Sequence, residues 1–527
     1  MDKLTLYFFS VCLFSALRVL KGDKISSCSQ TPYPEICDSL ISTTPLSTLD
    51  DTQFGFRDLA LQATVDHAEQ AYQLMSNMDL FSLDDRAKMA WTDCVELFED
   101  TISHLNRSLG STNPGRFEDA QTWLSAAVAN EQTCQNGFIE LNSTSHLASL
   151  PIMFGNISKL LSNSLAINKA VATSTAALSS KSGGGRRLLA GNFPNWVSAT
   201  ERKLLQSSTT ASKADLVVAK DGSGNYKTIS EAVAASSKLR SGTKRFIIYV
   251  KAGVYSENVE IKKMKNLMFI GDGIDATIVT SNKNVQDGST TFRSATFAVT
   301  GDGFIARDMT FQNTAGPQKH QAVALRSGAD FSVFYKCSFK GYQDTLYVYS
   351  QRQFYRDCDI YGTIDFIFGD AAAVIQNCNI YVRRPMSNQK NTVTAQGRSD
   401  PNENTGISIH NSRIMAASDL RPVQGSINTY LGRPWKKYSR TVIMKTDLGD
   451  LINPAGWLEW SGSFGLSTLY YGEYMNTGSG AATGRRVKWA GFHVITSAAE
   501  AGKYTAGSFL GGGSWIPASG VPYTSGL

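Results

Sequence analysis

Three stretches of the chain share one pattern: FSVFYKCSFKGYQDTLYV at 331–348, RQFYRDCDIYGTIDFIFG at 352–369 and AAVIQNCNIYV at 372–382. Aligned on their cysteines, they repeat after 21 and then 20 residues, and FIARDMTFQNT at 304–314 resembles an earlier copy. Each copy consists of short runs rich in Val, Ile, Phe and Tyr that end in Gly, Asn or Asp turns. Repeats of about 20 residues built from short strands are typical of a parallel β-helix, whereas a propeller blade is roughly twice as long.

The same period relates two aspartates. Asp344 and Asp365 each follow the cysteine of their repeat by seven residues and a glycine by three. Equivalent positions on neighbouring coils of a β-helix lie roughly 4.8 Å apart, so we expect the two carboxyl side chains to be neighbours. Two carboxylates at that distance repel each other, and one pKa should rise until that group keeps its proton. Such a pair supplies a general acid and a nucleophile together.

The remaining sequence divides into a leader, a helical region and a linker. The apolar run LTLYFFSVCLFSAL at 4–17 is too short to span a bilayer comfortably, and it predicts a secretory signal over 1–22, with a signal anchor as the alternative. Residues 23–176 carry apolar side chains at three- and four-residue intervals, which predicts an all-α four-helix bundle. Residues 177–206 predict a linker, and residues 207–527 an all-β domain folded as a right-handed parallel β-helix.

The linker and the helical region carry signs of an extracellular route. Two dibasic tetrads, Arg186–Leu189 and Arg202–Leu205, lie in a Ser-, Gly- and Thr-rich segment, where we expect a processing protease to cut. Three glycosylation sequons begin at Asn106, Asn142 and Asn156. We therefore expect a secreted protein with no stable membrane anchor after processing.

Charge is divided unevenly between the two halves of the chain. Residues 1–205 contain 16 basic and 21 acidic residues, a net charge of −5, and the remainder contains 35 basic and 24 acidic residues, a net charge of +11. A basic C-terminal domain attracts polyanions. Because the chain carries a secretory address, we expect no nucleic acid as a partner, and an anionic polysaccharide or a membrane surface fits better.

Seven cysteines lie outside the predicted signal. An oxidising compartment favours three bridges and one free thiol, and the sequence positions suggest which cysteines pair. The predicted disulfides are Cys28–Cys37, Cys94–Cys134 and Cys358–Cys378, which leaves Cys337 as a buried free thiol. No cysteine pair has zinc-type spacing and the six histidines are scattered, so we predict no metal and no cofactor.

Several of these segments point to a known family. GYQDTLYV, GTIDFIFG and LGRPW, together with HQAVALR and GVYSENV, closely resemble signature segments of plant pectin methylesterases, from about Ala214 to the C-terminus. CSQTPYPEIC and TWLSAAVANEQTCQNGF resemble the pectin methylesterase inhibitor domain. The resemblance implies an enzyme of the plant cell wall that removes methyl esters from homogalacturonan. It also implies an inhibitor-like pro-region that restrains the enzyme, and a separate inhibitor protein as a partner.

The resemblance assigns chemical roles to five of the side chains. Asp365 would attack the ester carbonyl, and Asp344 would protonate the departing methanol and then activate water. Gln343 and Gln321 would donate hydrogen bonds to the oxyanion. Arg433 would pair with Asp365 and keep it ionised.

Two further positions match substrate-binding residues of the family, Trp435 as a stacking face for a sugar ring and Thr291 as a contact to the polymer. Small departures from the family pattern, at Ile364 and Tyr349, touch none of these roles. Other aromatic residues could line a carbohydrate groove or belong to the core, and the sequence leaves that choice open: Phe368, Tyr342, Trp457 and Trp460.

Other functions remain open at this point. A serine esterase is disfavoured because no G-x-S-x-G segment occurs in the chain. Lyases and glycosidases that act on pectin also use β-helices, and a close carboxylate pair suits a retaining glycosidase. A non-enzymatic wall protein that binds polysaccharide through its basic surface is the third alternative. The helical region could equally serve as a folding or transport aid instead of an inhibitor.

Overall fold

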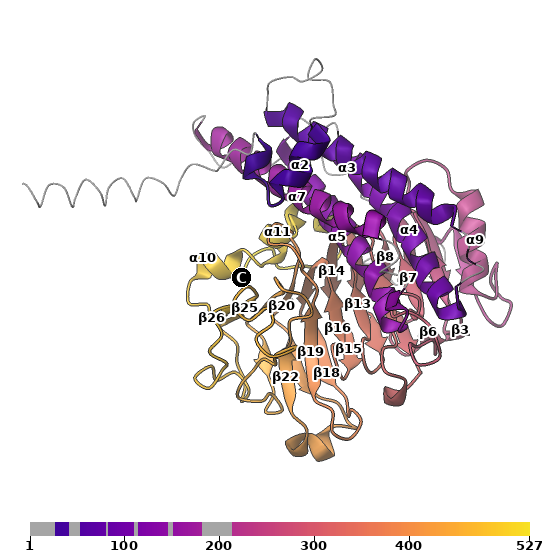
Figure 1. The fold of residues 1–527 in the computed structure, drawn as a ribbon. Helices are drawn as coiled ribbons and strands as arrows, with labels where there is room; N and C mark the ends of the chain where they lie inside the picture. Colours follow the sequence, from indigo (N-terminus) through magenta and orange to yellow (C-terminus); the bar gives the residue numbers. More distant parts are fainter. Residues whose placement is uncertain are drawn as a thin grey trace, which may run out of the picture.

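The computed structural model describes residues 27–41, 53–78, 80, 83–109, 114–145, 151–181 and 213–527. A helical domain comes first, and it lies along one side of a larger domain of parallel strands (Figure 1). The predicted signal at 1–22 lies outside the described residues. Of the predicted linker at 177–206, only residues 177–181 are described, and they continue the last long helix to Lys181.

The long helices of the N-terminal domain pack in a closed cycle. Helix α3 contacts α4 and α7, and α5 contacts the same two helices. The cycle buries large apolar side chains such as Trp91, Phe98 and Phe138. The predicted disulfides Cys28–Cys37 and Cys94–Cys134 are present, and the second ties α4 to α5. The elements are η2 (Cys28–Gln30), α2 (Pro34–Ile41), α3 (Gln53–Ser76), α4 (Asp85–Ser108), α5 (Pro114–Glu140) and α7 (Pro151–Lys181).

The C-terminal domain is a parallel β-helix with three sheets, and its coils supply strands to each sheet in turn. The first sheet contains β1 (Leu216–Val218), β2 (Phe246–Val250), β5 (Leu267–Gly271), β8 (Ile305–Arg307), β11 (Ser332–Tyr335), β14 (Arg352–Arg356), β17 (Ala372–Gln376), β20 (Gly406–His410), β23 (Arg440–Met444), β25 (Tyr470–Tyr474) and β26 (Phe492–Val494). The second contains β4 (Val259–Ile261), β7 (Phe297–Val299), β10 (Leu325–Ser327), β13 (Leu346–Val348), β16 (Ile367–Gly369), β19 (Asn391–Gln396) and β22 (Thr429–Gly432). The third contains β3 (Gly253–Ser256), β6 (Thr277–Ser281), β9 (Thr310–Asn313), β12 (Ser338–Lys340), β15 (Asp359–Gly362), β18 (Asn379–Val382), β21 (Arg413–Ala416) and β24 (Asp447–Leu448).

Short helices cover parts of the β-helix. Helix α9 (Ile229–Leu239) packs against the first coils, and its start is fixed by a capping box between Thr228 and Glu231. The C-terminal segment covers the outer face of the first sheet with apolar side chains, among them Trp515 and Ile516. The remaining short helices are η5 (Pro317–Lys319), η6 (Arg421–Ser426), α10 (Ala498–Gly502), α11 (Ala506–Phe509), η7 (Gly512–Ser514) and α12 (Ile516–Ser519).

Strand register confirms the repeat read from the sequence. Ser338 pairs with Asp359, and Asp359 pairs with Asn379, which reproduces the steps of 21 and 20 residues. Inside the coils, equivalent aromatic side chains stack, as with Phe334 and Tyr355 at 4.9 Å between ring centroids. These ladders fill the interior and hold the coil spacing constant.

The predicted disulfide Cys358–Cys378 is wrong, because both residues are free and buried, as is Cys337. Each thiol instead approaches a backbone carbonyl of the preceding coil, Cys358 that of Phe334 at 3.4 Å. In-register parallel strands hold Cβ atoms roughly 4.8 Å apart with parallel side-chain directions, whereas a disulfide needs Cβ atoms about 3.8 Å apart. Burial raises the pKa of the Cys358 and Cys378 thiols, so they are poor nucleophiles.

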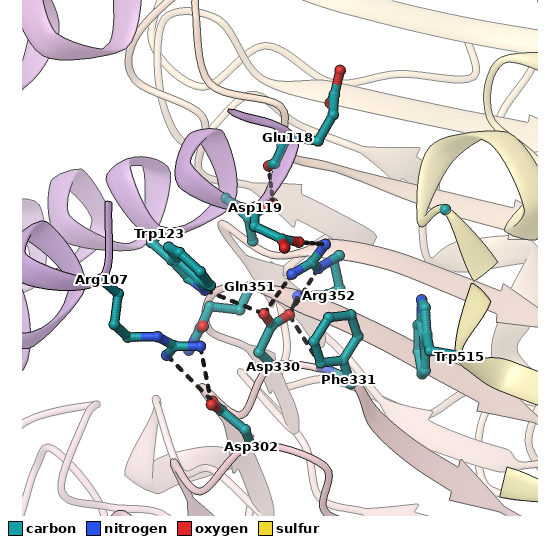
Figure 2. A network of polar contacts seen from close by, with 12 residues as sticks. Arg107, Glu118, Asp119, Trp123, Asp302, Asp330, Phe331, Gln351, Arg352 and Trp515 are labelled. Atoms are coloured by element: carbon teal, nitrogen blue, oxygen red, sulfur yellow. Dashed lines mark hydrogen bonds and ion pairs between the residues drawn. The ribbon is translucent and has the colours of Figure 1, made fainter. Parts of the chain in front are cut away.

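The two domains meet at several ion pairs, and one group of them lies beyond the ends of the second-sheet strands. Figure 2 shows this group, which we call the distal contact. Arg107 pairs with Asp302 at 3.0 Å, and Trp123 donates its indole N–H to Asp330 at 3.4 Å. Arg352 lies between Asp119 and Asp330, at 2.6 Å from each, and its guanidinium stacks on Phe331.

Candidate active site

Asp344 and Asp365 occupy equivalent turns of adjacent coils. Each lies two residues before a strand of the second sheet, and those strands are in register, with Leu346 paired to Ile367. Both aspartates adopt the left-handed backbone conformation, with φ of 63° and 50°. Asp tolerates this conformation better than most side chains, and it lets the chain turn sharply between two sheets. The sequence-based stacking of the pair is thus confirmed.

Asp365 is held by charge-assisted hydrogen bonds. Arg433 donates to both of its oxygens, from Nε at 2.8 Å and from a terminal nitrogen at 2.6 Å. Thr392 on the next coil donates its hydroxyl to the same carboxylate at 2.6 Å and accepts the Asp365 backbone N–H at 2.9 Å. A bidentate arginine and a hydroxyl donor favour the ionised carboxylate and fix its orientation.

Asp344 has a different environment, although it lies next to Asp365. It is 7% exposed, and burial raises its pKa well above the usual range. The negative charges of Asp365 and Glu140 add to this rise, while Arg433 opposes it. Two neighbouring carboxyl groups are therefore separated in acidity, with the proton resident on Asp344 and the charge on Asp365.

One cavity of about 270 Å³ collects the residues that the sequence singled out. Gln343 precedes Asp344, and its carbonyl accepts the N–H of Ala322, next to Gln321 on the preceding coil. All seven predicted catalytic and binding side chains border this cavity: Asp344, Asp365, Gln343, Gln321, Thr291, Arg433 and Trp435.

Aromatic side chains line the cavity beside the aspartates. Tyr347 and Phe368 stack with their ring centroids 4.1 Å apart, and Trp435 meets Phe368 edge-on at 5.9 Å. Trp460 also borders the cavity, 37% exposed, with the Arg433 guanidinium 4.4 Å from its ring centroid. Such faces suit the apolar side of a sugar ring. The other two aromatic candidates lie elsewhere: Trp457 is buried in the core, and Tyr342 accepts a hydrogen bond from Arg383.

The helical domain closes the cavity from the other side. Glu140, at the end of α5, accepts the Thr291 backbone N–H at 3.0 Å. Burial raises the pKa of Glu140 to about 7. Asp93 of α4 borders the same cavity and accepts the Thr290 hydroxyl. Other helical-domain residues on the border are Thr133, Asn136, Gly137 and Ile139.

Sequence reasoning missed three residues of this site. Thr392 follows β18, where the next strand pair joins Asn379 to Arg413 and the step grows from 20 to 34 residues, so the repeat no longer predicts positions. Glu140 comes from a domain that the repeat does not describe. Trp460 was among the undecided aromatics, and nothing in its local sequence separates it from Trp457.

Other sequence predictions bear on the surroundings of the site. The sequon residues Asn106, Asn142 and Asn156 are exposed, as glycosylation requires. Among the residues that the structure describes, no cluster of three or more His, Cys, Asp or Glu side chains could hold a metal ion. Within the same residues, no helix combines the length and apolar character that crossing a bilayer demands.

Two family models match the chain, one for each domain. The model described as Pectinesterase matches residues 215–513, and the model described as Plant invertase/pectin methylesterase inhibitor matches residues 25–167. The first match lies within the β-helix domain and the second within the helical half of the chain.

Full-length relatives combine the same two parts. "Probable pectinesterase/pectinesterase inhibitor 6" of Arabidopsis thaliana and "Pectinesterase 2" of Citrus sinensis are each 54% identical, with 98% of this chain and 98% of theirs covered. Among solved structures, a pectin methylesterase from carrot is 62% identical and matches 61% of this chain and 100% of its own, with a TM-score of 0.59. A pectin methylesterase from Aspergillus niger is 34% identical over 57% of this chain and 95% of its own, with a TM-score of 0.50. The chain therefore belongs to the pectinesterase family and carries a pectin methylesterase inhibitor-like domain ahead of the catalytic one.

Proposed function

We propose that this protein hydrolyses the methyl esters of homogalacturonan in pectin, giving pectate and methanol, by attack of an aspartate. One observation carries the proposal: two stacked aspartates share a cavity, one held by a bidentate arginine and the other buried with a raised pKa. The family assignment supports the reaction type and the substrate.

In the first half of the reaction, the Asp365 carboxylate adds to the ester carbonyl carbon. Gln343 and Gln321 donate amide hydrogens to the oxygen that becomes negative. The tetrahedral species collapses, the bond from carbon to methoxy oxygen breaks, and Asp344 transfers its proton to that oxygen. Methanol leaves, and the uronate acyl group stays on Asp365 as an anhydride.

In the second half, Asp344 is a carboxylate and takes a proton from water. The resulting hydroxide adds to the acyl carbon, and the bond to Asp365 breaks. Asp365 returns to its ionised form beside Arg433, Asp344 is protonated again, and the product is a free uronate. The raised pKa of Asp344 suits it to both proton transfers.

Substrate binding relies on the rest of the cavity border. Trp435 offers a ring face beside the aspartates, and Phe368 and Trp460 extend the apolar surface. Thr291 contributes its backbone N–H, which Glu140 occupies in the full-length chain. These contacts would position the ester carbonyl above Asp365.

We also propose that the helical domain inhibits the enzyme until the linker is cut. Helix α5 covers the cavity, and Glu140 lies close enough to Asp344 to raise its pKa. A polymer needs an open cleft, so the helical domain has to leave before pectin binds. A role as a folding or transport aid alone would leave full-length and cut chains equally active.

The route of the protein follows from the same proposal. The apolar stretch at 4–17 and the three exposed sequons support secretion to the cell wall. The tetrads Arg186–Leu189 and Arg202–Leu205 are the sites at which we expect a processing protease to cut. After that cut, a separate inhibitor protein of the same family could bind the exposed cleft.

Product analysis tests the reaction. The cut protein should release methanol from methyl-esterified pectin without shortening the polymer. New reducing ends or unsaturated uronates in place of methanol would instead support a glycosidase or a lyase. Absence of any product, with pectin still bound, would support a wall protein that only binds polysaccharide.

A further inference from the structure

A cationic site beside the cleft holds carboxylates of the helical domain. Arg293, between β6 and β7, donates from Nε to Asp93 and from a terminal nitrogen to Glu96, both on α4. Lys262, which follows β4, binds the same Glu96 carboxylate at 2.9 Å. Thr290 adds its hydroxyl to Asp93. Two helical-domain carboxylates thus occupy donors of the catalytic domain.

This site continues the catalytic cleft. Thr290 and Thr291 border the cavity that contains Asp344 and Asp365, and Arg293 lies two residues further along the same segment. Asp93 borders the cavity as well, while its carboxylate is bound by Arg293. A linear polymer that extends from the aspartates in this direction would reach Arg293 next.

Arg293 keeps its orientation without the helical domain. Its remaining terminal nitrogen lies 3.3 Å from Glu260, a residue of β4. Arg326 also approaches Glu260 at 3.5 Å and stacks on Phe292 with 3.4 Å from its guanidinium carbon to the ring centroid. The donors that now hold Asp93 and Glu96 would therefore point into the open cleft once α4 leaves.

We propose that Arg293, with Thr290 and Lys262, is a binding site for free carboxylates of galacturonate units that neighbour the ester under attack. The α4 carboxylates of Asp93 and Glu96 occupy it in the full-length chain as substitutes for the polymer. The identity of the ligand rests on the proposed function, whereas the recognition of a carboxylate rests on the contacts themselves.

The consequence is a preference for partly de-esterified pectin. A methyl ester cannot form a charge-assisted, bidentate pair with a guanidinium, but the uronate left by a previous turnover can. The protein would bind best where the polymer already carries a free acid on the Arg293 side. Successive reactions would then extend a de-esterified block.

The test uses the protein cut in the linker and separated from its helical domain. This part folds alone, because the solved carrot chain, 62% identical, aligns over its whole length with 61% of this chain. Affinity electrophoresis in gels that contain unesterified polygalacturonate measures binding without any turnover. Kinetics on fully methylated and on half-methylated pectin measure the preference.

Arg293→Gln should weaken polygalacturonate binding by roughly fivefold to tenfold and raise KM on half-methylated pectin by a similar factor. KM on fully methylated pectin and kcat on both substrates should change less than about twofold, because Arg293 does not touch the reacting atoms. Lys262→Gln, at a half-exposed position, should give a smaller shift in the same direction and serves if the first variant misfolds. Lys488→Gln, at an exposed position in the last coils, is the matched control and should change nothing.

Unchanged polygalacturonate affinity in both site variants would overturn the inference, as would an equal loss in the Lys488 control. If the cut protein released no methanol but Arg293→Gln still lost polygalacturonate binding, the proposed esterase function would be wrong and the carboxylate site right. Methanol release by a protein that does not bind polygalacturonate would mean the reverse.

Discussion

The helical domain meets the β-helix at two places whose charges are arranged differently. At the cleft, every charged group that we find on the helical side is an acid: Asp93 and Glu96 on α4 and Glu140 on α5. At the distal contact the signs alternate, since Arg107 pairs with Asp302 whereas Asp119 pairs with Arg352. A polyanion could replace the helices at the cleft but not at the distal contact. The cleft contact therefore competes with substrate, and the distal contact fixes how the domains dock.

The largest effect should come from removing the nucleophile beneath the cleft contact. Asp365→Asn keeps the size of the side chain and its bond with Thr392 but loses the charge that attacks the ester. We expect kcat of the cut protein to fall by about 10⁴-fold or more, as for other nucleophile substitutions. Methanol assays on purified variants measure this fall, with the melting temperature as a check on folding. A variant that kept a tenth of the activity would refute the assignment.

A change at the distal contact should affect stability instead of chemistry. Arg352→Ala leaves Asp330, which is fully buried, without its guanidinium partner. An uncompensated buried charge costs about 3–5 kcal/mol, so urea unfolding of the full-length chain should shift by that amount. Arg107→Ala is the matched control, because its partner Asp302 is also near Lys265, and it should cost about 1 kcal/mol or less. Equal losses in the two variants would contradict the role given to Arg352.

The cleft contact should weaken as pH rises, which the distal contact does not predict. In the docked state burial raises the pKa of Glu140 to about 7 from an ordinary value of 4.5. The docked state therefore keeps a proton that the separated state loses, so docking is favoured below pH 4.5, weakens between 4.5 and 7 and then levels off. Asp344, Asp93 and Lys436 also act on Glu140, so the full change is an order of magnitude, about 3 kcal/mol.

Gel filtration of the cut chain measures this pH effect. The two pieces should run together at pH 5 and separate more readily at pH 8. Glu140→Gln cannot ionise, and its pieces should show a flatter dependence over the same range. A wild-type chain that docks more tightly at pH 8 would show that the sign is wrong.

The smallest effect should come from the exposed rim of the cleft-side helix. Lys263 pairs with Glu99 at 2.7 Å, but both side chains are half exposed or more. Exposed pairs contribute about 0–1 kcal/mol and are screened by salt. Lys263→Gln should therefore change the docking free energy by less than about 1 kcal/mol, and 0.5 M salt should remove the difference, taking the Debye length as only about 4 Å there. A larger, salt-independent loss would mean that the rim contributes more to docking than the buried cleft residues.

The repeat explains both the success and the failures of the sequence-based predictions. Asp344 and Asp365 could be paired in advance because a β-helix converts a step of 21 residues into stacked positions. The same argument failed for Cys358 and Cys378, since stacking brings side chains near one another without turning their Cβ atoms together. Proximity follows from the period, but bond geometry does not.

Contacts between domains lay beyond the reach of the sequence. Glu140 and Thr291 are 151 residues apart, and neither lies in a motif that indicates its partner. The net charges of the two halves predicted attraction between them, but not which carboxylate enters the cleft. Thr392 was missed for a related reason: the coil after β18 is longer, and its residues lose the repeat numbering.

The central claim is that the aspartate pair is the catalytic site and that α5 covers it. The most direct test is methanol release from methyl-esterified pectin by one preparation, assayed before and after cleavage between residues 181 and 213. The account predicts that release rises at least about tenfold on cleavage, with Asp365→Asn inactive in both states. Equal release before and after the cut would contradict the covering role of α5, and active Asp365→Asn protein would contradict the site itself.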